Sequence, residues 1–300
     1  VRWVLGDWRK RNTGEHSSEK IIKTVGQPAG AIIAEVIDRG GAPLVACATL
    51  VRKVGSRGAR DLAAQKLVAL AKKEKPPRVQ TYHALGKVGS LKAVAHLEQV
   101  AREAAFETRT WALRALQLFP HVGVVETMKS IAGDTSLTDD KALLRDEAFT
   151  VLEKIDDPKS LDALASFLDP DEKDKDTAKT VRYRAAEAIL AGFKEKGLTK
   201  LLENLPSRYS YDKRDLEDFI EKDIRRLGAK ALPALRAALD SKSWVARLIA
   251  ARVLGEIGTK ADVAALEKLS GDRTRLKGWD GGATLGSEAR AALQKIKARK

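Results

Sequence analysis

A five-residue stretch, Leu254-Gly255-Glu256-Ile257-Gly258, closes a run of residues with the apolar spacing of a helix. Before it, Val245, Leu248, Ile249 and Val253 recur at intervals of three and four residues, which is typical of one helix face. The last glycine predicts a left-handed residue at the helix end, because residues with a Cβ adopt that conformation only at a cost. The stretch therefore predicts a helix that stops at a turn.

Similar stretches recur along the chain: an aliphatic residue, two variable residues, a large apolar residue and often a glycine. The steps between them range from 29 to 39 residues, the size of two helices with two turns. Such helix pairs bury their apolar faces by stacking on one another. The sequence therefore predicts an all-α fold, an α-solenoid of about eight helix pairs. The first positions of the stretches are Ile22, Val51, Leu85, Leu116, Leu152, Leu190, Ile224, Leu254 and Leu293.

The segment Gly258 to Leu266 and its counterparts resemble HEAT repeats, in particular the short repeats of bacterial HEAT-like and phycobilisome-lyase-like proteins. The resemblance covers roughly residues 15–300 and implies an α-α superhelix. It implies no particular activity, since HEAT arrays serve as scaffolds, as nucleic-acid binders and, in a few cases, as enzymes.

The repeats predict a single solenoid over residues 1–300. Residues 1–15, with two tryptophans and a basic run, are expected to form an N-terminal arm or cap. Two long steps predict loop insertions between helices, at 169–180 and 271–287, because Gly, Pro and Asp interrupt the helical pattern there. Insertions of this kind fall at the edges of a solenoid and often carry binding.

The two insertions differ in character. The acidic run from Asp169 to Asp176 lacks the glycine and glutamate positions of an EF-hand, so a solvated loop is expected. The other insertion places Trp279 among glycines and beside Arg273, Arg275 and Lys277. It is either a contact loop for a partner or a loop in which Trp279 packs against the last helix.

The net charge of +14 is distributed unevenly. Net charge is +8 over residues 1–75, +3 over 76–133, −7 over 134–180, zero over 181–223 and +10 over 224–300. A nucleic-acid duplex along the whole array would require positive charge throughout. Basic ends around an acidic centre favour a protein partner of mixed charge, or contact between copies of the chain.

Four arginines, at positions 109, 145, 182 and 247, recur near the start of the first helix of a pair, which is the helix that ends at the repeat stretch. Their stems can pack between repeats, which is a structural role, or their charges can meet a partner. Both interpretations stay open at this stage.

Catalytic and metal-binding motifs are absent from the sequence. No His-x-x-x-His pair, Gly-x-Ser-x-Gly elbow or P-loop occurs, and the His-Glu dipeptides of the iron-binding HEAT hydroxylases are missing. The HEAT-like DNA glycosylases require an Asp among concave-face aromatics, and neither Trp111 nor Trp244 is followed by one a turn later. Cys47 is the only cysteine, so no disulfide can form within the chain, and its apolar surroundings predict a buried thiol. We therefore expect no enzyme activity, no catalytic residues, no metal and no cofactor.

The sequence thus favours a non-catalytic scaffold or adaptor that binds a protein with the curved face of the array; self-association is possible. The alternative is a nucleic-acid-binding protein that uses the basic N- and C-terminal segments. Candidate partner-binding residues are second-helix polar positions and the basic insertion: Arg60, Lys66, Lys92, His96, Lys230, Arg236, Lys260, Lys268, Arg273, Arg275, Lys277 and Trp279.

No stretch of about 18 apolar residues occurs, so no membrane span is expected. No signal-peptide core opens the chain, which favours a soluble protein of the cytoplasm. The first residue is Val1 and not Met, so the sequence is a processed chain or a fragment, and export after signal removal stays open.

Overall fold

The computed structural model describes residues 44–170 and 175–299. The chain divides into two compact units, Val1–Val151 and Leu152–Lys300, and each is described by itself. The N-terminal arm expected at 1–15, the first repeat stretch at Ile22 and part of the acidic loop lie outside the described residues. The prediction of one continuous solenoid stays a prediction.

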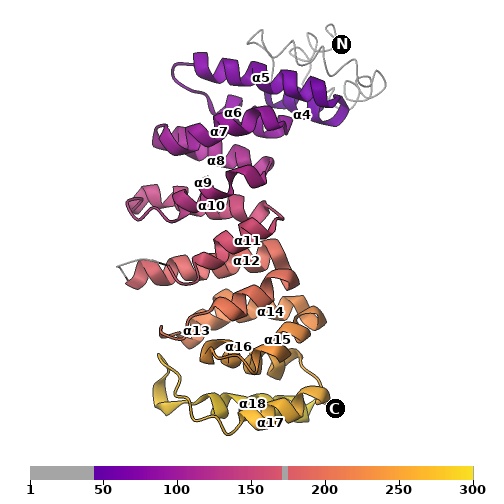
Figure 1. Ribbon diagram of the computed structural model, residues 1–300, viewed down its shortest axis with the longest axis vertical. Coiled ribbons are helices and arrows are strands. Elements are labelled where there is room, and N and C mark those ends of the chain that lie inside the picture. The colour runs from indigo at the N-terminus through magenta and orange to yellow at the C-terminus, as the bar shows by residue number, and fades with distance from the viewer. Residues whose placement is uncertain (1–43, 171–174, 300) are drawn as a thin grey trace, which may run out of the picture. The chain divides into compact units, whose positions relative to one another are not determined.

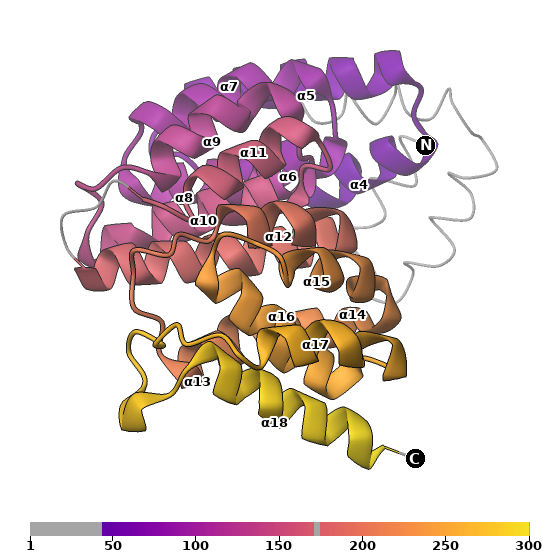
Figure 2. The same ribbon diagram turned by 60° about the horizontal axis from the view of Figure 1, so that its bottom comes forward.

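The first unit is built from helix pairs. Helices α4, α6 and α8 contact one another in order, as do α5, α7 and α9, and successive helices pack across the two rows. Figure 2 shows α5, α7 and α9 along one side of this unit. The helices are α4 (Leu44–Val54), α5 (Arg57–Lys73), α6 (Val79–Val88), α7 (Leu91–Glu103), α8 (Phe106–Leu118), α9 (Val125–Ala132) and α10 (Ala142–Lys154, which continues into the second unit), with 3-10 turns at Val122–Val124 and Asp139–Lys141.

The second unit repeats this arrangement. Helices α12, α14, α16 and α18 contact one another in order, while α15 packs on α12 and α16, and α17 on α18. Figure 1 shows α16, α17 and α18 together at the C-terminal end of this unit. Its elements are α11 (Pro158–Ser166), α12 (Lys175–Asn204), α13 (Lys213–Leu216), a π-helical turn (Glu217–Glu221), α14 (Lys222–Leu227), a 3-10 turn (Gly228–Ala231), α15 (Leu232–Ala238), α16 (Trp244–Ile257), a 3-10 turn (Lys260–Asp262), α17 (Val263–Leu269), a 3-10 turn (Asp280–Gly282) and α18 (Leu285–Ala298).

The fold-class prediction is confirmed. The regular secondary structure of the described residues is helical. The β-type pairing among these residues is an isolated bridge between Arg275 and Thr284. In each unit, two rows of helices share a core made mainly of Ala, Leu, Val and Ile, as in an α-solenoid. Helix α12 is one exception to simple pairing, because Lys194 (φ 50°, ψ −130°) breaks it into two helices that serve as a pair. No helix among the described residues is long and apolar enough to cross a membrane.

In two repeat stretches, a glycine directly follows the leucine and allows neighbouring helices of one row to approach closely. A Cβ on Gly86 would lie 2.6 Å from the Ala115 carbonyl oxygen, and one on Gly255 would lie 2.9 Å from the Ala292 Cα. Both glycines are therefore contact points, of α6 with α8 and of α16 with α18.

The final glycine of the stretch does not always adopt the left-handed conformation that the pattern predicts. Gly89 does (φ 64°, ψ 50°), and it follows α6. Gly258 instead is extended (φ −70°, ψ 174°), so the prediction is wrong there. Its N–H donates to the Leu254 carbonyl over 2.7 Å, and a Cβ would lie 2.5 Å from that oxygen. The glycine is needed at Gly258 because the chain passes close to the helix end, not because φ is positive.

Three of the four recurrent arginines have a structural role. The guanidinium groups donate to carbonyls at or after the end of the preceding second helix: Arg109 to Ala101 over 2.8 Å, Arg145 to Ala132 over 2.9 Å and Arg247 to Ser241 over 2.6 Å. They thereby satisfy carbonyls that a helix end leaves unpaired. Arg182 differs, since it lies under the Tyr209 ring, 3.7 Å from the ring centroid.

Both insertions are shorter than predicted. Helix α12 already begins at Lys175, so residues 175–180 are helical, and α18 begins at Leu285, which leaves 271–284 as the second loop. Cys47 is fully buried in α4, and burial raises the pKa of its thiol to about 11. This thiol is therefore the inert core residue that its neighbours indicated.

Candidate functional site

The loop 271–284, here called the Trp279 loop, is fixed to a distant segment of the second unit. The Trp279 indole N–H donates to the Tyr211 carbonyl over 2.9 Å, and the Tyr211 N–H donates to the Lys277 carbonyl over 3.1 Å. Leu276 is buried beneath the loop, and its N–H donates to Ala283 over 3.0 Å. Trp279 thus packs on the segment before α13. Arg273, Arg275 and Lys277 remain exposed on the loop.

The Trp279 ring lies beside two cations from other elements. Lys213 Nζ is 5.3 Å and Arg252 Cζ is 5.2 Å from the ring centroid. Lys213 begins α13, where Asp212 caps the helix by accepting from the Arg214 N–H over 2.8 Å. The loop, α13 and α16 therefore meet around one half-buried indole.

Arg252 joins three carboxylates beneath this point. Its guanidinium donates to Glu221 over 2.6 Å, to Glu217 over 3.2 Å and to Glu288 over 3.1 Å, and so connects the π-helical turn, α16 and α18. Glu221 is only 1% exposed, and burial raises the pKa of its carboxyl against the opposing effect of Arg252. We call these four residues the Arg252 network.

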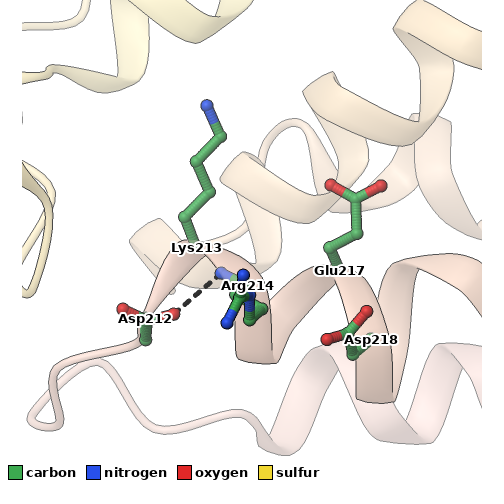
Figure 3. Close-up of a pocket in the computed structure, with 5 residues that line it drawn as sticks. All are labelled: Asp212, Lys213, Arg214, Glu217 and Asp218. Atoms are coloured by element: carbon green, nitrogen blue, oxygen red, sulfur yellow. Dashed lines mark hydrogen bonds between the residues drawn. The ribbon is translucent and has the colours of Figure 1, made fainter.

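A hollow of about 630 Å³ opens above α13, lined by Asp212, Lys213, Arg214, Glu217 and Asp218 (Figure 3). Figure 3 shows Lys213 and Glu217 rising from the same side of the helix. Three carboxylates and two cations line the hollow, so it offers charges of both signs. A partner surface with both signs would fit it better than a uniformly charged one.

The remaining predicted residues of the second unit are mostly engaged in ion pairs. Arg236 Nε lies 2.6 Å from Asp262, Lys268 Nζ lies 3.1 Å from Asp240 and Lys230 Nζ lies 3.8 Å from Glu195. The Lys268 and Lys230 pairs are exposed and contribute little to stability, whereas the Asp262 carboxylate that Arg236 contacts is buried. Lys260 is exposed, and no ion pair joins it to another residue that the structure describes.

The predicted residues of the first unit lie on α5 and α7. Arg60 and Lys66 are half-buried and Lys92 is exposed. His96 stacks on Tyr82 with ring centroids 6.3 Å apart, and burial, with a smaller effect of Lys72, lowers the pKa of its imidazole. The structure brings together only Arg273, Arg275, Lys277 and Trp279 in one loop; the other predicted residues are dispersed.

The sequence did not point to Lys213, Glu217 or Arg252. Lys213 and Arg252 come from helices tens of residues away from Trp279, and no local pattern in the sequence links them. Within the described parts of the chain, no group of three or more His, Cys, Asp and Glu side chains is placed to hold a metal ion.

No protein-family model matches the chain. A search of curated proteins returned no match either. Among solved structures, the chain is similar to human deoxyhypusine hydroxylase in complex with glycerol, with 18% sequence identity and a TM-score of 0.30. The similarity covers 89% of this chain and 97% of that protein.

The expectation that the chain is not an enzyme is contradicted by this comparison, because the similar structure is that of an enzyme. We withdraw that expectation. At this identity and TM-score, the similarity assigns no reaction to the chain.

Proposed function

We propose that the chain is a HEAT-like repeat scaffold or adaptor, of the short bacterial kind, that binds a protein partner. The observation that carries this proposal is the Trp279 loop. It is held in place by hydrogen bonds to Tyr211, yet it presents Arg273, Arg275 and Lys277 to solvent. A rigid loop with exposed charges loses little conformational freedom on binding, which favours affinity.

The surroundings of the loop support a protein partner over a nucleic acid. Asp212, Glu217 and Asp218 line the hollow beside Lys213, and these carboxylates would repel closely spaced phosphates. A protein segment with both acidic and basic side chains can pair with both signs. The net charge of −7 over residues 134–180 acts in the same direction.

The test is affinity capture of partners with two charge-matched variants. Arg275→Glu with Lys277→Glu reverses the loop charge, while Lys159→Glu with Lys222→Glu reverses two exposed lysines elsewhere in the same unit. We expect the loop variant to lose the partner, or the second copy of the chain, that the wild type and the control retain. Identical partner profiles for all three proteins would exclude the loop as the binding surface.

A nucleic-acid partner is a second candidate, and the exposed cations of the Trp279 loop favour it. It is distinguished by a gel shift at increasing salt, because each phosphate that the protein neutralises releases counterions and so steepens the salt dependence of binding. A steep loss of duplex affinity between low and physiological salt is expected if this candidate is right. Absent or salt-insensitive binding would remove it.

A further inference from the structure

A second surface lies in the first unit, where residues of α6, α8 and α10 line one cleft. The cleft, of about 430 Å³, opens between helices of one row. Val79 and His83 come from α6, Trp111 and Leu118 from α8, and Glu147 from α10. Pockets between helices of about this size commonly hold one or two large apolar groups.

The floor of the cleft is apolar. Val79 is 44% exposed at the start of α6, although it is a large aliphatic residue. Trp111 is half-buried and its ring lies 6.1 Å from that of Tyr82, which fixes its position. Leu143 is 39% exposed and precedes Glu147 by one helical turn on α10, so it extends the apolar surface beyond the cleft.

The polar wall of the cleft carries no net charge near neutral pH. Arg114 Nε lies 2.7 Å from the Glu147 carboxylate, which also accepts from Gln117. Burial, and to a smaller extent the charge of Lys87, lowers the pKa of His83, so its imidazole is neutral at pH 7. A charged group inserted here would lose hydration without gaining a counter-charge, so the occupant is uncharged and apolar.

Two cations lie beside residues that line this cleft. The Arg52 guanidinium on α4 donates to the Leu118 carbonyl over 3.3 Å, and Arg52 is exposed. Lys87 follows His83 by one turn on α6. A partner that enters the cleft is therefore attracted if acidic residues flank its apolar group.

We propose that this cleft binds a leucine- or phenylalanine-sized side chain of a polypeptide whose neighbouring residues are acidic. The inference rests on the proposed function in one respect, that the partner is a polypeptide. It concerns a different unit from the Trp279 loop, so each surface can be removed by its own variants.

The test uses a display library of random twelve-residue peptides against three forms of the full chain. Val79→Asp places a charge in the cleft at a helix start, where an acid is well tolerated. The matched control is Leu91→Asp, which makes the same kind of change at the start of α7, at a leucine that is 49% exposed and does not line the cleft. Circular dichroism checks that all three proteins are folded.

We expect the wild type and Leu91→Asp to enrich peptides with a large apolar residue flanked by Asp or Glu. For an enriched peptide, we expect Val79→Asp to raise Kd at least about tenfold. Equal affinity for Val79→Asp, enrichment of acidic peptides without an apolar residue, or no enrichment would overturn the proposal. The Arg275→Glu, Lys277→Glu variant should bind the same peptides as the wild type, so failure of the loop proposal would leave this result unchanged.

Discussion

At the scale of single residues, the least usual group is Glu221. Its side chain is 1% exposed, and one of its carboxylate oxygens, Oε2, accepts no hydrogen bond. Burial of a carboxylate disfavours its charged form, which explains why the pKa of Glu221 is raised although Arg252 lies 2.6 Å away. The second unit thus contains a carboxyl group that is more easily protonated in the folded state than in the unfolded state.

This raised pKa predicts a pH dependence of stability. Between the unfolded-state and folded-state pKa values of Glu221, the folded chain binds more protons, so stability falls as pH rises through this window. As pH is lowered from 7 towards the ordinary pKa of a glutamate, the wild type should gain stability relative to Glu221→Gln, which cannot titrate. Urea unfolding of both proteins at several pH values measures the difference. A difference that stays constant with pH would contradict the raised pKa.

At the scale of elements, the Arg252 network connects three segments of the second unit: the π-helical turn, α16 and α18. Arg252 on α16 is hydrogen-bonded to the π-helical turn through Glu217 and Glu221, and to α18 through Glu288. Removing this cation would leave the buried Glu221 carboxylate with only the more distant Arg225, whose Nη1 lies 3.9 Å away, which is far more costly than losing an exposed ion pair.

Arg252→Met should therefore lower the free energy of unfolding by about 3–5 kcal/mol. The matched control is Arg226→Met, because Arg226 is 66% exposed and pairs with Asp223 near the surface. That change should cost less than about 1 kcal/mol. Chemical denaturation of the three proteins gives both values. Equal losses for the two variants would mean that the network contributes no more than a surface pair.

The contact of α16 with α18 depends on the absence of a side chain at Gly255. Gly255→Ala would place a Cβ 2.9 Å from the Ala292 Cα, so the helices must move apart. We expect a loss of about 1–3 kcal/mol, typical of overpacking. Gly271→Ala is the control, since no atom lies within 4 Å of its added Cβ, and it should change stability by less than about 0.5 kcal/mol. A thermal or urea melt that ranks the two variants equally would contradict the close-contact role.

At the scale of the whole molecule, the chain consists of units whose helices contact mainly their neighbours in sequence. In such arrays, stability is approximately a sum over local interfaces. Perturbations at Gly86 in the first unit and Gly255 in the second should then act independently.

Gly86→Ala and Gly255→Ala should consequently be additive. Gly86 approaches Ala115 as Gly255 approaches Ala292, and the two contacts share no residue. The double variant should lose the sum of the two single losses to within about 0.5 kcal/mol. The three unfolding free energies, measured under one set of conditions, test this. A large deviation would show that the two glycine contacts are energetically coupled.

The repeat pattern in the sequence was sufficient for the fold class. The spacing of apolar residues such as Val245, Leu248 and Ile249 reflects local helix geometry, which a sequence records directly. The repeat stretch also located the helix ends. At Gly258, however, it predicted a left-handed residue where the backbone is extended. The loop bounds at 169–180 and 271–287 were too wide because the first turns of α12 and α18 contain polar residues that resemble loop.

The sequence alone determined that the chain folds as stacked helix pairs, that Cys47 is buried and that a basic loop surrounds Trp279. Only the tertiary structure decided which distant residues lie together: Trp279 beside Lys213 and Arg252, and Val79 in one cleft with Trp111 and Glu147. The physical reason is range. Helix periodicity acts over three or four residues and is written in every turn, whereas a binding surface forms from side chains that stacking brings together across thirty or more residues. Which side chains meet depends on how closely neighbouring helices can pack. At Gly86 and Gly255, this close packing requires a residue without a Cβ.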